Sequence, residues 1–102
     1  MAREKKLPLV TPGEILLEEF LKPLEMNAHQ LALALRVPAN RIGGIIEGRR
    51  AISVDTALRL ARYFGVNAEF WINLQAHYDL RKAEREIAAT ILREVRPRER
   101  AA

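Results

Sequence analysis

The sequence contains no cysteine among its 102 residues, which excludes disulfide bonds and thiolate metal sites. Long apolar runs are also missing. The longest one, Leu31 to Leu35, is far too short to span a bilayer. No apolar signal segment follows the charged residues near Met1. We therefore expect a protein of the cytoplasm that has no membrane partner.

Residues that serve catalysis and metal binding are scarce and scattered. The two histidines, His29 and His77, are far apart and form no His-x-x-x-His pair on a helix. Gly43, Gly44 and Gly48 lie in or at the end of a predicted helix, whereas a phosphate-binding glycine loop follows a strand. We therefore expect no enzyme activity, no catalytic residue, no cofactor and no bound metal.

Strand-like alternation of apolar and polar residues is also absent, and helical spacing takes its place. With 49% hydrophobic and 29% charged residues, the chain has the balance of one globular domain with a single modest core. The 17 basic residues exceed the 13 acidic ones, and the net charge of +4 suits a polyanionic partner. The same excess is equally common in proteins that need it only for solubility. The predicted fold class is all-α.

Capping residues and glycines place the ends of the helices. Thr11-Pro12-Gly13-Glu14 predicts a capping box at the first helix, and Asn27 with Gln30 predicts another at the second. Ser53 and Asn67 are the expected N-caps of two later helices. The expected spans are about 12–21, 28–35, 39–47 and 54–64, followed by helix from 68, with glycines 48 and 65 ending the third and fourth.

Apolar residues at helical spacing define the faces that we expect to be buried. The predicted face of the 54–64 helix is Ala57, Leu58, Leu60, Ala61 and Phe64. The predicted stripe of the next helix is Phe70, Trp71, Leu74 and Tyr78. Because no glycine or proline forces a break between Asn67 and Arg96, one long helix and two shorter ones both remain open.

The stretch from Ala28 to Ser53 predicts two short helices with a tight corner between them. Val37 is apolar where a loop is normally polar, so we expect it to plug the angle between the helices. Ala32 is small where two crossing helices come closest. The apolar residues at helical spacing are Leu31, Ala32 and Leu35 on the first helix, and Ile42, Ile45 and Ile46 on the second. This pattern is typical of a helix-turn-helix, which places its second helix in the DNA major groove.

The outer side of the second helix carries the DNA-binding prediction. If the three isoleucines face the core, the 100° step per residue places the outer set opposite them. That set is Ala39, Asn40, Gly43, Gly44 and Glu47, with Arg41 at the flank. Glycine within a helix costs roughly 0.5–1 kcal/mol relative to alanine. Close approach of the helix backbone to DNA and a locally loose helix are both open explanations for the glycine pair.

Several side chains match known pairings with nucleic acid. Asn40 can pair with an adenine edge, and Arg41 with a guanine or a phosphate. Arg49 and Arg50 follow the helix in a loop, where we expect them to bind phosphates without reading sequence. The complete set of expected DNA contacts is Asn27, His29, Gln30, Ala39, Asn40, Arg41, Gly43, Gly44, Arg49 and Arg50.

Beyond Tyr78 an amphipathic helix follows, with charges of both signs on its outer face. Its apolar residues are Leu80, Ala83, Ile87, Ile91 and Val95. If this stripe is exposed, a partner is needed to cover it. Self-association would supply that partner, because helix-turn-helix proteins bind two half-sites as dimers. The expected interface is Trp71, through one edge, with Leu80, Ile87 and Ile91. The expected organisation is a flexible basic arm (1–10), a helix-turn-helix domain (11–79), an amphipathic helix (80–96) and a disordered tail (97–102).

Five segments together resemble the HigA antitoxins of the Xre-type, phage-repressor-like helix-turn-helix group. They are Thr11-Pro12-Gly13-Glu14-Ile15-Leu16, Val37-Pro38-Ala39-Asn40-Arg41-Ile42, Gly48-Arg49-Arg50-Ala51-Ile52-Ser53, Asp55-Thr56-Ala57-Leu58-Arg59-Leu60-Ala61 and Glu69-Phe70-Trp71-Ile72-Asn73-Leu74-Gln75. The resemblance covers about residues 9–80. The last segment makes it fairly specific, because the helix-turn-helix alone is shared by many regulators.

The resemblance implies a five-helix domain, a homodimer and repression of the protein's own operon at a palindromic operator. It also implies a second partner, a cognate HigB-like toxin that cleaves mRNA on the ribosome and is neutralised by the antitoxin. Three departures from the family pattern stand out. Arg36 replaces the usual turn glycine, which requires a left-handed backbone or a reshaped corner. Ala28 replaces a polar residue, and the pair at 43 and 44 replaces more polar side chains, so base readout is expected to differ.

Two alternatives to the antitoxin hypothesis stay open at this point. The first is a stand-alone Xre-type transcriptional regulator without a toxin. The second is a protein-interaction module that neutralises a toxin and binds DNA only weakly, since Gly43 and Gly44 offer no side chains to DNA. A small basic reading frame next to the gene would favour the antitoxin, and loss of promoter binding on substitution of Arg41 or Arg49 would exclude the weak binder.

Overall fold

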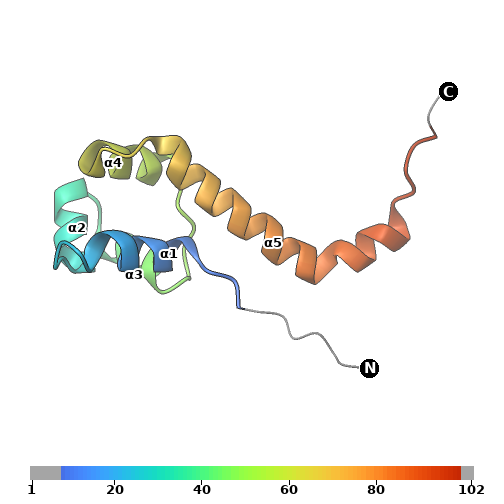
Figure 1. Cartoon of the computed structure of the whole chain (residues 1–102), viewed down its shortest axis with the longest axis horizontal. Helices are drawn as coiled ribbons and strands as arrows, with labels where there is room; N and C mark the ends of the chain where they lie inside the picture. The colour runs from blue at the N-terminus through green and yellow to red at the C-terminus, as the bar shows by residue number, and fades with distance from the viewer. Residues whose placement is uncertain (1–7, 100–102) are drawn as a thin grey trace.

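The computed structural model describes residues 8–99, and helices are the only regular secondary structure in that range (Figure 1). In chain order they are α1 (Pro12–Ile15), the π-helical segment η1 (Leu16–Leu21), α2 (Ala28–Leu35), α3 (Ala39–Ile46), α4 (Val54–Phe64) and α5 (Ala68–Glu94). The predicted all-α class is confirmed. The predicted N-terminal arm falls largely, and the predicted tail partly, outside the described residues.

The helices begin at the capping residues that the sequence predicts. The Glu14 backbone N–H donates to the Thr11 hydroxyl over 3.1 Å, and the Thr11 N–H donates to the Glu14 carboxylate over 3.0 Å. At α2 the Gln30 N–H donates to the Asn27 side-chain oxygen over 2.8 Å, and the Asn27 N–H donates back over 2.9 Å. Both capping boxes are therefore confirmed. They satisfy backbone donors that the first helical turn leaves unpaired.

The end of α3 is also closed by local geometry. Gly48 has a φ of 81°, in the left-handed region. Its N–H donates to the Ile45 carbonyl over 3.1 Å, and the Arg49 N–H donates to the Gly44 carbonyl over 2.8 Å. This pair of bonds is a Schellman motif, which satisfies carbonyls at a helix end and reverses the chain. The loop after α3 is thereby folded back toward the helix that it leaves.

One core joins the domain, and Trp71 lies at its centre with none of its surface exposed. The rings of Phe20, Phe70 and Phe64 surround it, with centroids 4.7, 5.0 and 6.2 Å from that of the tryptophan. The other buried hydrophobic residues are Leu16, Leu21, Leu31, Ala32, Leu35, Ile42, Ile45, Ile52, Ala57 and Leu60. The expected edge of Trp71 at a dimer interface is therefore wrong, because neighbouring rings and helices already cover it.

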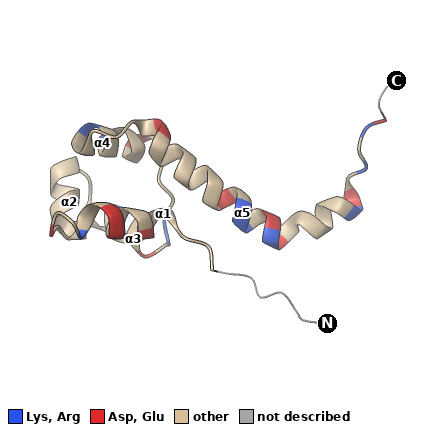
Figure 2. Cartoon of the chain, viewed as in Figure 1, with Lys and Arg blue, Asp and Glu red and all other residues tan. Residues whose placement is uncertain are grey.

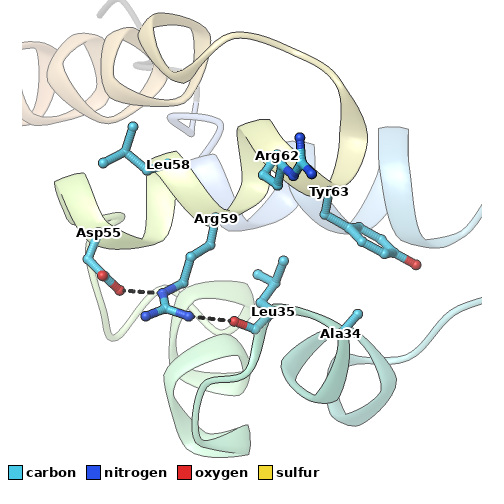
Figure 3. A pocket seen from close by; sticks show the side chains of 7 residues that line it. All are labelled: Ala34, Leu35, Asp55, Leu58, Arg59, Arg62 and Tyr63. Atoms are coloured by element: carbon cyan, nitrogen blue, oxygen red, sulfur yellow. Dashed lines mark hydrogen bonds and ion pairs between the residues drawn. The ribbon is translucent and has the colours of Figure 1, made fainter.

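Leu58 is a second correction. It was predicted to lie on the buried face of α4, but the structure leaves 58% of it exposed. Leu58 and Leu60 are two residues apart, so they lie about 200° apart around a helix and do not share one face. Leu60 is buried, and Leu58 instead lines a shallow groove between α2 and α4 (Figure 3).

Gly13 brings α1 directly against α3. A Cβ built on Gly13 would lie 1.9 Å from the Ile45 carbonyl oxygen and 2.8 Å from the Ile46 Cα. No side chain fits between the two backbones, so the glycine sets how closely they pack. From the sequence, this residue was predicted only as part of a helix start.

α5 is one continuous helix, which decides the question that the sequence left open. Its first part packs on the core through Trp71, whereas its second part bends and extends away from the other helices (Figure 1). Charged residues of both signs gather in the middle of α5 and again near its end (Figure 2). Among those in the middle, Arg81 pairs with Glu84 and Lys82 with Glu86. No helix among residues 8–99 combines the length and apolar character that a membrane span requires.

Candidate nucleic-acid interface

The corner between α2 and α3 is built on Arg36 and Val37. Arg36 has φ 63° and ψ 45°, the left-handed conformation, so the turn keeps its usual path without the usual glycine. The Val37 N–H donates to the Ala32 carbonyl over 3.1 Å, and the Val37 side chain is half-buried against the core. The predicted apolar plug is confirmed, because Val37 is half-buried against the core at the corner between the two helices.

The orientation of α3 agrees with the prediction. Ile42 and Ile45 are buried, and Ile46 packs partly buried against the core. Ala39, Asn40 and Glu47 are exposed on the other side. α3 therefore has one face anchored to the protein and one face open to solvent, as a DNA-reading helix requires.

The two glycines of α3 differ sharply in their surroundings. A Cβ on Gly43 would have no atom within 4 Å, so this position is open. A Cβ on Gly44 would lie 3.1 Å from Arg50 Cδ and 3.3 Å from Arg50 Cβ. Gly44 is consequently buried, although it lies on the side of α3 away from the isoleucines. The prediction that both glycines are bare is wrong for Gly44, because a side chain from the following loop covers it.

Arg41 is held in a network that links three helices. Its Nη1 donates to Asp55 Oδ2 over 2.6 Å, and Arg59 Nε donates to the same oxygen over 2.9 Å. Arg59 Nη1 also donates to the Leu35 carbonyl at the end of α2 over 2.8 Å (Figure 3). Hydrogen bonds from Arg59 and then Arg41 lower the pKa of the Asp55 carboxyl below its ordinary value. Asp55 thus joins the start of α3 to the start of α4.

The loop after α3 adds two further arginines. Arg49 Nε donates to Glu47 Oε1 over 2.9 Å, so this arginine is paired with a carboxylate on the outer side of α3. Arg50 is exposed, and its side chain has no hydrogen-bond or ion-pair partner among residues 8–99. Its backbone N–H donates to the Gly44 carbonyl over 3.1 Å.

Asn27, His29 and Gln30 lie together at the start of α2 and are all exposed. The side-chain oxygens of Asn27 and Gln30 are already used in the capping box, which leaves their amide N–H groups for other partners. Two acidic residues that matter here were not among the predicted site residues. In the sequence, Asp55 was noted only as part of a segment that resembles the HigA antitoxins, and Glu47 only as an exposed position. The pairing of Asp55 with Arg41, 14 residues away, leaves no local sequence signal. The spacing of Asp55 to Arg59 (i,i+4) and the closeness of Glu47 to Arg49 are local signals that could have pointed to the other two pairs.

A half-buried turn, a reading helix with one open face and arginines at its rim together define a DNA-binding helix-turn-helix protein. The helix-turn-helix family model HTH_3 matches residues 17–71, more than half of the chain. The chain belongs to this family. Because the fold serves DNA binding, the family also agrees with the prediction that the chain is not an enzyme.

Individual relatives place the chain more closely. It is 51% identical over 85 residues to virulence-associated protein I of Dichelobacter nodosus, covering 83% of this chain and 79% of that one. The solved structure of Pseudomonas aeruginosa antitoxin HigA with the higBA promoter is 42% identical, with a TM-score of 0.84 over 86% of this chain and 96% of that one. Antitoxin GraA in complex with its operator is 36% identical, with a TM-score of 0.86 over 97% and 100%. The resemblance to HigA antitoxins is therefore confirmed.

Proposed function

We propose that this chain is the antitoxin of a type II toxin–antitoxin system and that it represses its own operon as a DNA-binding homodimer in the cytoplasm. The observation that carries the proposal is the open outer side of α3. Ile42 and Ile45 anchor the helix from behind, and arginines flank its exposed side. HigA with its promoter and GraA with its operator are relatives solved on DNA, which supports the same role here.

Each group of exposed side chains has its own part in the proposed complex. Asn40 lies near the start of α3, where it can donate to and accept from an adenine edge in the major groove. Gly43 has open space above it, which lets the helix backbone approach the bases. Arg49 lies in the loop and His29 at the start of α2, where both meet the phosphate backbone on either side of the groove.

The second part of α5 provides the proposed dimer interface. Leu80, Ile87 and Ile91 are 53%, 48% and 47% exposed and line an apolar groove along the helix. A second copy of the chain is the natural occupant, because an isologous contact pairs the same stripe with itself. Such a dimer presents two α3 helices to two half-sites of a palindromic operator.

The proposed toxin is a small mRNA-cleaving protein that the chain binds and neutralises. The relationship to antitoxins supports this partner. A stand-alone regulator of the same family is the alternative, since several relatives carry only the name of transcriptional regulator. Co-expression with the product of the adjacent gene separates the two. Co-purification and relief of growth arrest support the antitoxin, whereas no complex with that product supports the stand-alone regulator.

Operator binding is tested by fluorescence anisotropy on a duplex of the protein's own promoter. Arg49→Ala should weaken binding several-fold and reduce the slope of log K against log salt by about 1, as expected for one lost phosphate contact. Arg62→Ala is the matched control, because Arg62 is also exposed but lies near the end of α4, away from α3. If neither Arg41→Ala nor Arg49→Ala weakens promoter binding at moderate salt, the proposed DNA face is wrong.

A further inference from the structure

Three arginines lie around the open side of α3, and only one of them is uncommitted. Arg41 donates to Asp55, and Arg49 donates to Glu47. Arg50 has no side-chain partner among the described residues and is exposed. A guanidinium that is not neutralised by a carboxylate keeps its full set of donors for an external ligand.

The stem of Arg50 lies on the outer side of α3. Gly44 is two residues after Ile42, so it faces about 200° away from that buried isoleucine. A Cβ on Gly44 would lie 3.1, 3.3 and 3.4 Å from Arg50 Cδ, Cβ and Cγ. The Schellman turn and the bond from the Arg50 N–H to the Gly44 carbonyl return the loop to this place. Arg50 therefore crosses the helix face that the missing side chain leaves free.

The Arg50 side chain supplies this side of α3 with hydrogen-bond donors that the helix itself lacks there. Gly43 and Gly44 have no side chain that could contact a base pair, and the exposed residues of α3 include Asn40 and Glu47. The arginine fork matches the O6 and N7 acceptors of guanine, the commonest specific contact in the major groove. We propose that Arg50, resting on Gly44, reads a guanine in each operator half-site, which goes beyond the phosphate contact expected from its place in a loop. This inference rests on the proposed DNA-binding function.

The first test is selection from a library of duplexes with a randomised central segment, followed by sequencing. The wild-type protein should enrich a motif that contains a guanine in each half-site. Arg50→Ala should lose the preference for that guanine by roughly 5-fold or more, the low end for a bidentate pair, while it keeps the other preferred bases. Arg49→Ala, the matched neighbour, should lower affinity for all sequences and leave the motif unchanged.

The possible results separate the inference from the function beneath it. If the wild-type protein enriches no motif, the proposed function fails. If the wild-type protein enriches a motif and Arg50→Ala retains every base preference, Arg50 does not read a base. Equal loss of binding to all sequences by Arg50→Ala also overturns the inference, because that is the signature of a phosphate contact. Thermal melting of each variant shows that the fold is kept.

The second test uses the two glycines as a matched pair. Gly44→Ala places a methyl group against the Arg50 stem, whereas Gly43→Ala meets no protein atom within 4 Å. Gly44→Ala should weaken the guanine preference, and adding it to Arg50→Ala should cause no further loss, because both act through one side chain. Additive losses would instead mean that Gly44 acts by direct approach to DNA, and would overturn its role as the seat of Arg50.

Discussion

Arg36 occupies a backbone conformation that favours glycine. Its φ of 63° brings its Cβ close to its own carbonyl, a strain of roughly 1–2 kcal/mol for a residue with a side chain. The corner tolerates this strain because Val37 and the helices on both sides are held by the core. The left-handed turn is thus imposed on Arg36 by packing elsewhere, and Arg36 does not itself favour it.

Arg36→Gly should therefore stabilise the protein. We expect the free energy of unfolding to rise by about 1 kcal/mol, less than the full strain because glycine adds freedom to the unfolded chain. The corresponding rise in melting temperature is about 4–8 °C for a domain of this size. Thermal melting followed by circular dichroism measures it. Arg36→Ala is the control, since alanine removes the same charge but keeps the Cβ. An equal gain in both variants would assign the effect to charge.

Three glycines in and around the α1–α3 contact show that the effect of adding a side chain depends on the atoms around each position. Gly13 allows two backbones to touch, Gly44 accommodates the stem of Arg50, and Gly43 faces open space. Replacement by alanine would consequently have a different effect at each position. A Cβ at Gly13 overlaps backbone that has no room to yield, and overpacking of a core typically costs 1–3 kcal/mol.

At the scale of whole elements, Asp55 connects α4 to α3 and, through Arg59, to the end of α2. These charged groups are partly exposed, so solvent and salt screen their attraction. The contribution of the network to stability is accordingly small. Its geometric effect is larger, because one carboxylate fixes the directions of two arginines from different helices.

Asp55→Asn should lower stability in a way that depends on pH. Arg59 and Arg41 lower the pKa of Asp55 in the folded protein below the ordinary value of 3.8. Above the ordinary value the carboxylate is charged in both states and its stabilisation is complete. As the pH falls through the lowered pKa, the carboxyl group is protonated and the stabilisation is lost. The difference in melting temperature between wild type and Asp55→Asn should thus be constant above about pH 5 and shrink below about pH 4.

Melting curves at low salt from pH 6 to pH 2.5, collected in parallel for both proteins, measure this difference. A gap that keeps its size through pH 2.5 would show that the carboxylate charge is not its cause.

At the scale of the whole molecule, the domain has a compact part and an extended part. α1 to α4 and the first part of α5 share one core around Trp71, whereas the remainder of α5 extends away with apolar residues in solvent (Figure 1). A helix that extends into solvent gains little stability from packing against its own chain. Its apolar stripe is stabilised when a partner covers it. The proposed dimer accounts for both features.

Ile91→Asp should convert the proposed dimer to a monomer. A carboxylate in a paired apolar stripe loses hydration without gaining a partner, which strongly disfavours association. The molar mass from light scattering should halve, and promoter affinity should fall about tenfold or more because the two half-sites are no longer bound together. Leu33→Asp is the control, since Leu33 is similarly exposed on α2. A wild-type protein that is already monomeric on and off DNA would exclude this interface.

Features carried by neighbouring residues were predictable from the sequence. The caps at Thr11, Asn27, Ser53 and Asn67 depend on residues three positions apart, and each N-cap bond is present in the structure. The orientation of α3 followed from the spacing of its isoleucines. The left-handed corner at Arg36 was one of two possibilities, because the sequence shows which residue lies in the turn but not whether the turn is reshaped.

The corrections all concern contacts between residues that are distant in the chain or on opposite helix faces. Leu58 was placed on the core side although it lies about 200° from Leu60 around the helix, so the helical repeat itself already argued against a shared buried face. Trp71 was given an exposed edge because two of the rings that cover it, Phe20 of η1 and Phe64 of α4, come from other segments of the chain. The partners of Arg41 and Gly44 were missed for the same reason, since each lies beyond the helix that holds the residue.

The sequence by itself determined the helical class, where the helices begin and which side of α3 is free, because capping and helical periodicity act over a few consecutive residues. Only the tertiary structure decided which charged groups are paired, which glycine is covered and which apolar residues remain in solvent. Those outcomes depend on which side chains from remote segments fill the same space. Packing between segments therefore decides which side chains of the DNA-facing surface are free to bind. Local capping and periodicity decide only which part of the chain forms that surface.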